Sequence, residues 1–126
     1  MQIHVHPGDE LPIYRQVVRQ ITDAIAGGRL KPGDKLLSHR DLAEQLVIAP
    51  LTVKKAYDEL ERVGLIETQR GRGTFVSERP PVAGPREKRE RLRDAAQRLV
   101  SQAALADVPF SEVVDLLREI QKGMKS

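Results

Sequence analysis

Two arginines at a glycine-rich turn are the side chains of this sequence best suited to bind an anion. Arg70 and Arg72 flank Gly71, and the segment from Gln69 to Thr74 contains no acidic residue. A guanidinium group keeps its charge and presents a planar set of donors that fits phosphates and base edges. Exposed arginines on a hairpin are more often merely solvated, but the missing acidic partners favour contact with a polyanion.

Basic and hydroxyl side chains also lie near the starts of two predicted helices upstream. Thr52, Lys54 and Lys55 fall mainly on the polar side of a helix that begins near Pro50, whose first turn also carries Leu51. The lysines would pair equally well with acidic residues one turn later, so for each lysine alone both interpretations stay open. Arg40 follows Ser38, a residue expected to cap the start of the second helix.

The chain lacks the patterns of catalytic and metal sites. Ser38 stands near His39 and Asp41 but without the strand-to-helix turn of an activated nucleophile. His4 and His6 alternate as on one face of a strand, without a nearby third ligand. With no cysteine there is neither a disulfide framework nor a thiolate cage. We expect a protein that is not an enzyme and needs no cofactor or metal.

The composition limits the size of the core and the kinds of partner that the chain can have. A chain of 126 residues with 40% hydrophobic residues supplies one modest core. The formal charge of +3, from 21 basic and 18 acidic residues, is too small to identify a nucleic-acid partner by itself. A basic cluster from Arg86 to Arg93 is interpreted as an aid to solubility. The N-terminal residues lack an uninterrupted apolar run, so we expect a cytoplasmic protein with no membrane partner.

The predicted elements place the basic side chains on a helix-turn-helix. A first helix begins near Pro12 and stops at Gly27, and a turn leads into a short strand or extended link over Lys35–Leu37. A second helix follows Ser38, with Asp41 at its third position, and ends before Pro50. The third helix runs on to Gly64, with an inner face formed by Val53, Ala56, Tyr57, Leu60 and Val63.

A hairpin and two further helices complete the prediction. Segments Leu65–Gln69 and Thr74–Ser77 flank the glycine-arginine turn and form a wing. The fold class is therefore mainly α with a small β-hairpin: a winged helix-turn-helix over residues 1–79, a Pro/Gly linker over 80–85, and a helical dimerisation unit over 86–126. One helix is predicted from about Arg86 to Ala106, and a shorter one follows Pro109 and stops before Gly123. Two amphipathic helices alone leave an apolar face uncovered, and pairing with a second copy would cover it. The residues expected in that interface are Leu92, Ala96, Leu99, Ala103, Phe110, Val113, Leu117 and Ile120.

The order of these motifs resembles the GntR family of bacterial regulators from about Pro12 to Val76. The matching segments are PIYRQ at 12–16, GRLKPGDKL at 28–36, SHRDLA at 38–43, TVKKAY at 52–57, LE at 60–61, GLI at 64–66 and GRGTFV at 71–76. The short C-terminal part is similar to the YtrA subfamily, whose two-helix ending dimerises without a large effector pocket.

The resemblance implies a DNA-binding role for particular residues. Arg40 would contact a base or phosphate, Lys54 would contact DNA, and the tip around Gly71 would enter the minor groove. The chain departs from the family where relatives often carry Ser-Arg or Asn-Arg, because it has Ala49-Pro50 there. Base readout must then fall more on Arg40, Thr52, Lys54 or Leu51, the last touching a thymine methyl.

The sequence thus predicts a homodimeric, sequence-specific repressor that binds a pseudo-palindromic operator in double-stranded DNA. The predicted contact residues are Ser38, Arg40, Leu51, Thr52, Lys54, Lys55, Arg70, Gly71 and Arg72. Two alternatives stay open: a winged helix used for protein-protein interaction, and an N-terminal fragment of an aminotransferase-fused member of the family. Whether a small-molecule effector binds, and which one, is also left open.

Overall fold

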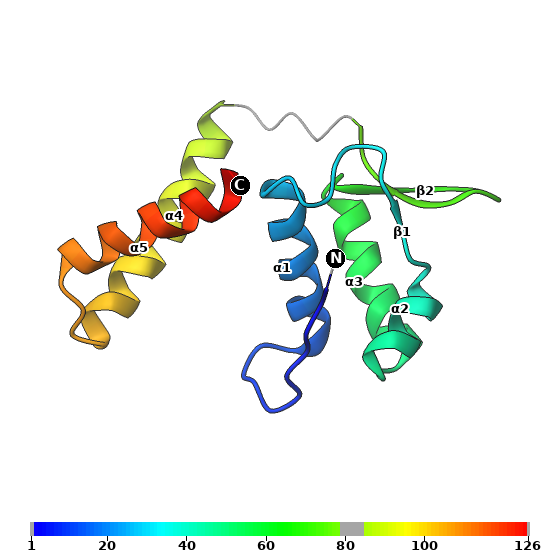
Figure 1. Ribbon diagram of the computed structural model, residues 1–126, viewed down its shortest axis with the longest axis horizontal. Coiled ribbons are helices and arrows are strands. Elements are labelled where there is room, and N and C mark those ends of the chain that lie inside the picture. The colour runs from blue at the N-terminus through cyan, green and yellow to red at the C-terminus, as the bar shows by residue number, and fades with distance from the viewer. Residues whose placement is uncertain (1, 79–84, 126) are drawn as a thin grey trace. The chain divides into compact units, whose positions relative to one another are not determined.

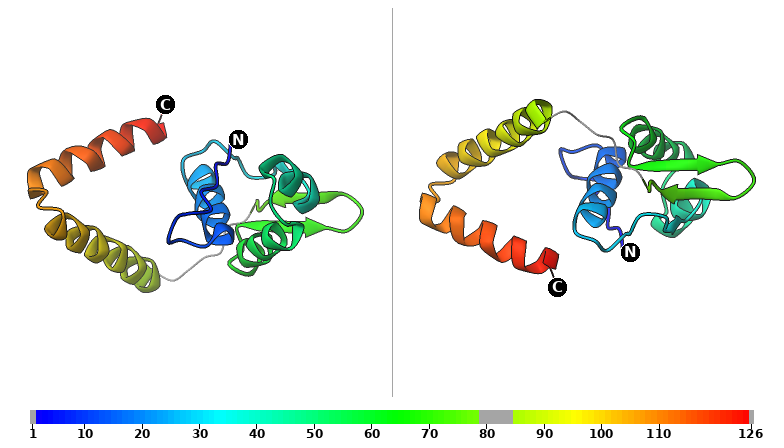
Figure 2. Two further views of the ribbon diagram at one scale, coloured as in Figure 1. Left: turned by 90° about the horizontal axis from the view of Figure 1, so that it is seen from below. Right: turned by 90° about the horizontal axis from the view of Figure 1, so that it is seen from above.

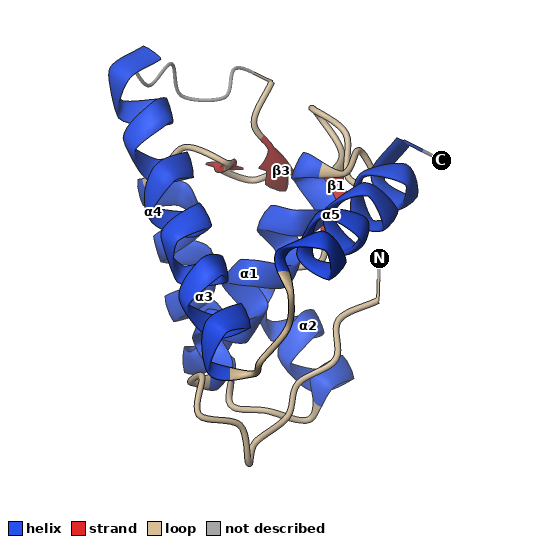
Figure 3. Cartoon of the chain, turned by 90° about the vertical axis from the view of Figure 1, so that its left-hand side faces the viewer, coloured by secondary structure: helices blue, strands red, loops and turns tan. Residues whose placement is uncertain are grey.

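The structure is a computed structural model that describes residues 2–78 and 85–125. The chain divides into two compact units, Met1–Pro81 and Val82–Ser126. The first unit contains α1 (Ile13–Ala26), β1 (Lys35–Leu36), α2 (His39–Leu46), α3 (Pro50–Arg62), β2 (Ile66–Gln69) and β3 (Gly73–Val76), and the second contains α4 (Pro85–Leu105) and α5 (Phe110–Lys125) (Figure 1). Helices dominate and the strands are few and short, which confirms the predicted fold class (Figure 3).

An N-terminal arm lies along α1 and is held there by two glutamines. The buried Gln16 side chain accepts a hydrogen bond from the His6 amide at 2.8 Å and donates to the His6 carbonyl at 3.0 Å. One helical turn later, Gln20 makes the same pair of bonds with His4, at 2.9 Å and 2.5 Å. Because these bonds fix the register of the arm, Ile3 becomes part of the core.

Helix α2 begins and ends at defined backbone signals. The Ser38 hydroxyl oxygen accepts a hydrogen bond from the Asp41 amide at 3.1 Å, which confirms the predicted cap. The helix ends at Leu46 because Val47 takes the left-handed conformation, with φ 58° and ψ 50°. Ala49 is extended, as the residue before a proline must be, and α3 starts directly at Pro50.

Helix α3 is the centre of the first unit. Its inner face buries Val53, Ala56, Tyr57 and Leu60, as the periodicity predicted, whereas Val63 is only half-buried. The Tyr57 hydroxyl donates a hydrogen bond of 2.7 Å to the carbonyl of Leu37, in the link between β1 and α2. Burial raises the pKa of Tyr57 to about 12, because a phenolate would lose its hydration there.

The strands form a three-stranded antiparallel sheet in the order β1-β3-β2. In β2 and β3, Ile66 pairs with Val76 and Gln69 with Gly73, while Lys35 of β1 pairs with Phe75. The predicted short strand at 35–37 therefore exists, one residue shorter, and joins the outer side of the hairpin. The loop between β2 and β3 extends beyond α2 and α3 (Figure 2).

The core of the first unit lies between its helices and the sheet. Val17 and Ile21 of α1, Leu60 of α3, Ile66 of β2 and Val76 of β3 are almost completely buried. Each such side chain contributes about 1.5 to 3 kcal/mol relative to an exposed one. The short sheet is thus anchored to α1 and α3 by its inward residues, and this leaves its turn free to project.

The second unit consists of α4 and α5, which diverge like the arms of a V from the short link Ala106–Pro109 (Figure 2). Asp107 in this link has a positive φ of 56°. Two boundaries differ from expectation: α4 already begins at Pro85, a residue favoured in a first turn, and α5 continues through Gly123 to Lys125. The predicted linker otherwise falls on residues outside those described. No described helix is long and apolar enough to cross a membrane.

Candidate nucleic-acid interface

One face of α3 points away from the core. Lys54 and Lys55 follow Leu51 by three and four residues, Asp58 follows the two lysines by four and three, and all four side chains are exposed. Thr52 lies between the two faces and is half-buried. Because the opposite face is fixed in the core, this stripe is presented rigidly, with Leu51 in the first turn and the two lysines in the second.

Both lysines of this stripe already have partners. The Lys54 ammonium lies 3.0 Å from an Asp58 carboxylate oxygen, with both side chains more than half exposed. The Lys55 ammonium lies 4.1 Å from the centroid of the Tyr14 ring of α1. An exposed ion pair contributes a few tenths of a kcal/mol and an exposed cation–π contact about 0.5 to 1 kcal/mol, so a phosphate can replace either partner at small cost.

The start of α2 presents a further cation. Arg40 is the second residue of the helix and is exposed, directly after the Ser38 cap. Within the described part of the chain its guanidinium has no ion-pair partner. A cation in the first turn opposes the helix dipole, so the fold itself gains nothing from this charge.

The wing tip carries the remaining predicted contacts. Arg70, Gly71 and Arg72 are exposed, and neither guanidinium forms an ion pair with any residue that the structure describes. The Arg72 amide donates to the Gln69 carbonyl at 2.9 Å, and Gly71 has a φ of 77° that closes the turn. A Cβ built on Gly71 would meet no atom within 4 Å, so the tip is narrow and open.

Four of the nine predicted contact residues line two hollows of the first unit, whereas Arg40 and Lys54 line neither. Ser38 and Asp41 line one of them together with Gly73 and Thr74, so the start of α2 adjoins the end of β3 that follows the wing turn. Leu51, Thr52 and Lys55 line the other with Ile13 and Tyr14, at the starts of α3 and α1. Arg70, Gly71 and Arg72 line neither and lie at the far end of the hairpin (Figure 2).

Val47, which the sequence-based set omitted, is the unexpected residue of this surface. It is a β-branched residue in the left-handed region, and its side chain is exposed. The available signal was an apolar residue in a turn that otherwise favours Gly or Asn. Periodicity could not reveal it, because a turn residue belongs to neither helical stripe.

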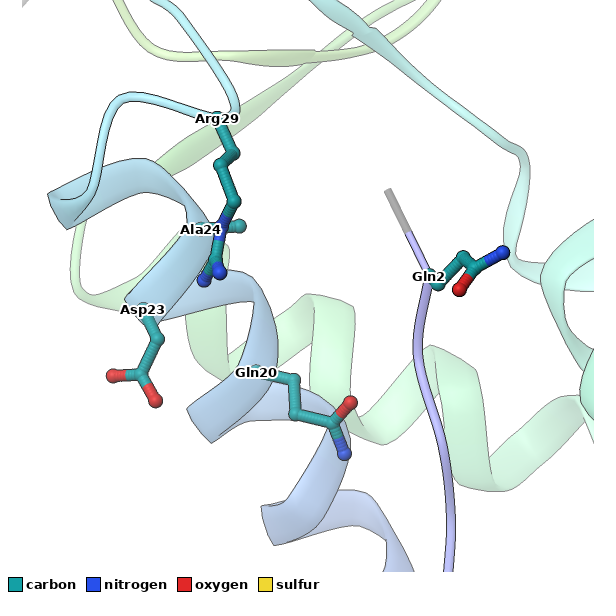
Figure 4. A pocket seen from close by; sticks show the side chains of 5 residues that line it. All are labelled: Gln2, Gln20, Asp23, Ala24 and Arg29. Atoms are coloured by element: carbon teal, nitrogen blue, oxygen red, sulfur yellow. The ribbon is translucent and has the colours of Figure 1, made fainter. Parts of the chain in front are cut away.

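The other candidate ligand sites lack the side chains that would bind a particular ligand. His4 and His6 are both exposed, and no metal-binding group was found among the described residues. A hollow of about 490 Å³ is lined by Gln2, Gln20, Asp23, Ala24 and Arg29 (Figure 4). The Gln20 amide is already occupied by His4, and the two charged residues are exposed. Without convergent buried polar groups this hollow does not identify an effector.

In the second unit, most of the predicted dimerisation residues are exposed. Leu92, Ala96, Phe110, Leu117 and Ile120 are exposed, and Leu99 and Ala103 are half-buried. Val113 differs, since it is buried within the single chain. Further exposed apolar side chains not in the predicted set are Val100, Leu105, Leu116 and Met124.

Comparison with known proteins gives consistent matches. The family described as "Bacterial regulatory proteins, gntR family" matches residues 13–76. The chain is 38% identical to the HTH-type transcriptional repressor YtrA of Bacillus subtilis, over 98% of the chain and 95% of that protein. The structure of YtrA from Sulfolobus acidocaldarius superposes with a TM-score of 0.63 at 39% identity, covering 79% of this chain and 97% of that one.

A DNA complex is also among the similar structures. The DNA-binding domain of AraR in complex with operator ORX1 superposes with a TM-score of 0.52 at 33% identity. The match covers 58% of this chain and 90% of that domain.

Proposed function

The chain belongs to the gntR family of bacterial regulatory proteins, in its YtrA-like branch, and we propose that it is a cytoplasmic transcriptional repressor that binds a pseudo-palindromic operator as a homodimer. As a DNA-binding regulator of this family it is not an enzyme. The observation that carries the proposal is the placement of three exposed arginines, Arg40 at the start of α2 and Arg70 and Arg72 at the wing tip. None of the three has an ion-pair partner among the described residues, and the fold is shared with an operator-bound relative.

Each element has its own contact with the duplex in this proposal. The first turns of α3 lie in the major groove, where residues at the start of a second helix reach base edges. The tip of the wing lies in the minor groove, whose negative potential favours Arg70 and Arg72. Ser38 and Arg40 contact the backbone or a base beside the wing. Lys54 and Lys55 exchange Asp58 and Tyr14 for phosphates at small cost.

Dimerisation through the second unit is supported by the exposure of its apolar residues. Phe110 is 73% exposed and Leu92 is 72% exposed in the single chain. Helices that diverge leave such side chains in water, and a second V can interlock with the first to enclose them. The proposed interface consists of Leu92, Ala96, Leu99, Ala103, Phe110, Leu117 and Ile120, while Val113 supports it from within each chain.

The arginines provide the test of DNA contact. An operator selected from a random pool is titrated by mobility shift with Arg40→Ala and Arg72→Ala, at several salt concentrations. Each lost phosphate contact lowers the slope of log affinity against log salt by about 0.9. The matched control is Arg62→Ala, at the other end of α3, whose guanidinium is held by Glu59 at 2.6 Å.

The proposal expects weaker binding by both variants and unchanged binding by Arg62→Ala. Unchanged affinity in both Arg40→Ala and Arg72→Ala would remove the proposed contacts. Contacts with phosphates release counterions, so they make the affinity for DNA fall as salt rises. If the affinity for the operator did not depend on salt, the protein would lack these contacts, and a protein-protein interaction module would be favoured instead.

A further inference from the structure

An apolar surface interrupts the polar face of the helix-turn-helix at the point where α2 gives way to α3. The segment from Val47 to Leu51 reads Val-Ile-Ala-Pro-Leu and contains no polar side chain. Val47 is 87% exposed and Leu51 is 77% exposed, and Ala49 and Pro50 are also exposed. Only Ile48 packs against the core. Val47 and Leu51 are thus two exposed apolar side chains four residues apart, on either side of the start of α3, and we call them the turn pair.

The side chain of Val47 does not stabilise the fold. Its backbone is left-handed at φ 58°, a conformation that disfavours β-branched residues and favours Gly or Asn. Its side chain contributes almost nothing to the core, since nearly all of it is in water. A strained residue whose side chain stabilises nothing within the chain is a candidate for contact with a partner.

The position of the turn pair identifies that partner. Leu51 is the first member of the outward stripe of α3, followed one turn later by Lys54 and Lys55. These cations suit a polyanion, so the apolar pair lies at the front of a surface suited to DNA. On the floor of the major groove the apolar group that a base pair offers is the 5-methyl group of thymine.

The first turn of α3 offers few other means of reading a base. Ala49 and Pro50 carry no side-chain donor, and Thr52 is half-buried. The two lysines lie one turn later, and the proposed function assigns them to phosphates. Van der Waals contact is therefore the main readout available at the tip of this helix.

We propose that Val47 and Leu51 select the operator by packing against the 5-methyl groups of thymines in the major groove of each half-site. The inference rests on the proposed DNA binding and adds to it the chemical group that is recognised. It requires that specific thymines, and not merely A·T pairs, are needed at the positions facing the turn pair.

The test removes single methyl groups from the DNA. In an operator selected from a random pool, each thymine is replaced in turn by deoxyuridine, which keeps the base-pair hydrogen bonds and loses only the methyl group. Affinities are measured for the wild-type protein and for Val47→Ala and Leu51→Ala at one salt concentration. Both substitutions are at exposed positions, and comparing the variants with the wild type shows whether Val47 or Leu51 contacts the methyl group.

The expected result is a loss of about fourfold in affinity for each contacted methyl, at one or two thymines in each half-site. At those thymines the difference between thymine and uracil disappears in Val47→Ala or Leu51→Ala, as a coupled pair requires. The inference is overturned if no thymine shows the effect, or if the effect is equal in all three proteins. Failure to select any operator would instead contradict the proposed function itself.

Discussion

Tyr57 links the third helix of the DNA-binding unit to the segment that leads into the second. Its hydroxyl donates to the Leu37 carbonyl at 2.7 Å. We expect Tyr57→Phe to lower the free energy of unfolding by about 1 kcal/mol, because the carbonyl loses this donor. Denaturant titration at pH 7 measures the change. Tyr14→Phe is the matched control, since the Tyr14 hydroxyl has no hydrogen-bond partner among the described residues; equal stabilities of the two variants would contradict the assignment.

Tyr57 also predicts how the free energy of unfolding changes at alkaline pH. Burial raises the pKa of Tyr57 to about 12, whereas tyrosine in an unfolded chain titrates near 10. The contribution of the neutral phenol is therefore fully present below about pH 10 and is lost as the pH rises toward about 12. Urea titrations at pH 9 and pH 11 should show a larger loss for the wild type than for Tyr57→Phe, and parallel losses would refute this.

Val47 tests backbone strain separately from DNA binding. A left-handed conformation costs an ordinary residue about 1 to 2 kcal/mol, and Asn tolerates it better. We expect Val47→Asn to raise the free energy of unfolding by about 1 kcal/mol and Val47→Ala to change it little. Both remove the branched side chain, but only Asn suits the backbone. If thermal or denaturant unfolding finds Asn no more stable than Ala, Val47 is not strained.

Single residues were predictable where a local rule governs them. The Ser38 cap and the buried face of α3 follow from side-chain chemistry and periodicity, and the structure confirms both. The exposure of Val47, the Lys54–Asp58 pair and the Lys55–Tyr14 contact were not settled by the sequence. The two lysine contacts depend on which of several partners of similar interaction energy a surface side chain meets.

At the scale of elements, the stability of α2 depends on its N-cap residue, Ser38. Ser38→Ala removes the acceptor for the Asp41 amide and should lower the free energy of unfolding by about 1 kcal/mol. Ser38→Asn retains an acceptor and should remain close to the wild type. Thermal unfolding without DNA measures this apart from any contact of Ser38 with an operator. Equal melting temperatures of the two variants would mean that the cap does not stabilise α2.

Element boundaries were predicted to within a few residues wherever a strong stop signal exists. Gly27 ends α1 and Pro50 begins α3 as expected. The exception is Gly123, through which α5 continues to Lys125. A single glycine costs only about 1 kcal/mol in a helix, so it does not end a helix without a supporting turn. The pairing of β1 with β3 was also beyond the sequence, because it joins residues far apart in the chain.

At the scale of the whole molecule, the proposed function assigns dimerisation to the second unit. A charge at Leu117 or Ile120, which are about half exposed in the single chain, should prevent a shared apolar core. Sedimentation should give the wild type a mass of twice 14.1 kDa and give Leu117→Asp and Ile120→Asp the mass of one chain.

Gln121→Asp is the control, because it adds the same charge at an exposed polar neighbour of Ile120. It should remain a dimer. A monomeric wild type, or a dimer that tolerates all three substitutions, would contradict dimerisation through α4 and α5. Composition and periodicity predicted two amphipathic helices. They could not predict how a second copy would pack against them, because that arrangement depends on contacts between two chains.

The central claim is that the helix-turn-helix and the wing bind one duplex together and select its sequence. Its most direct test is the affinity for an operator selected from a random pool against that for a scrambled duplex of equal composition, at moderate ionic strength. We expect the selected operator to bind at least about a thousandfold more tightly. Equal affinity for the two duplexes would contradict the account.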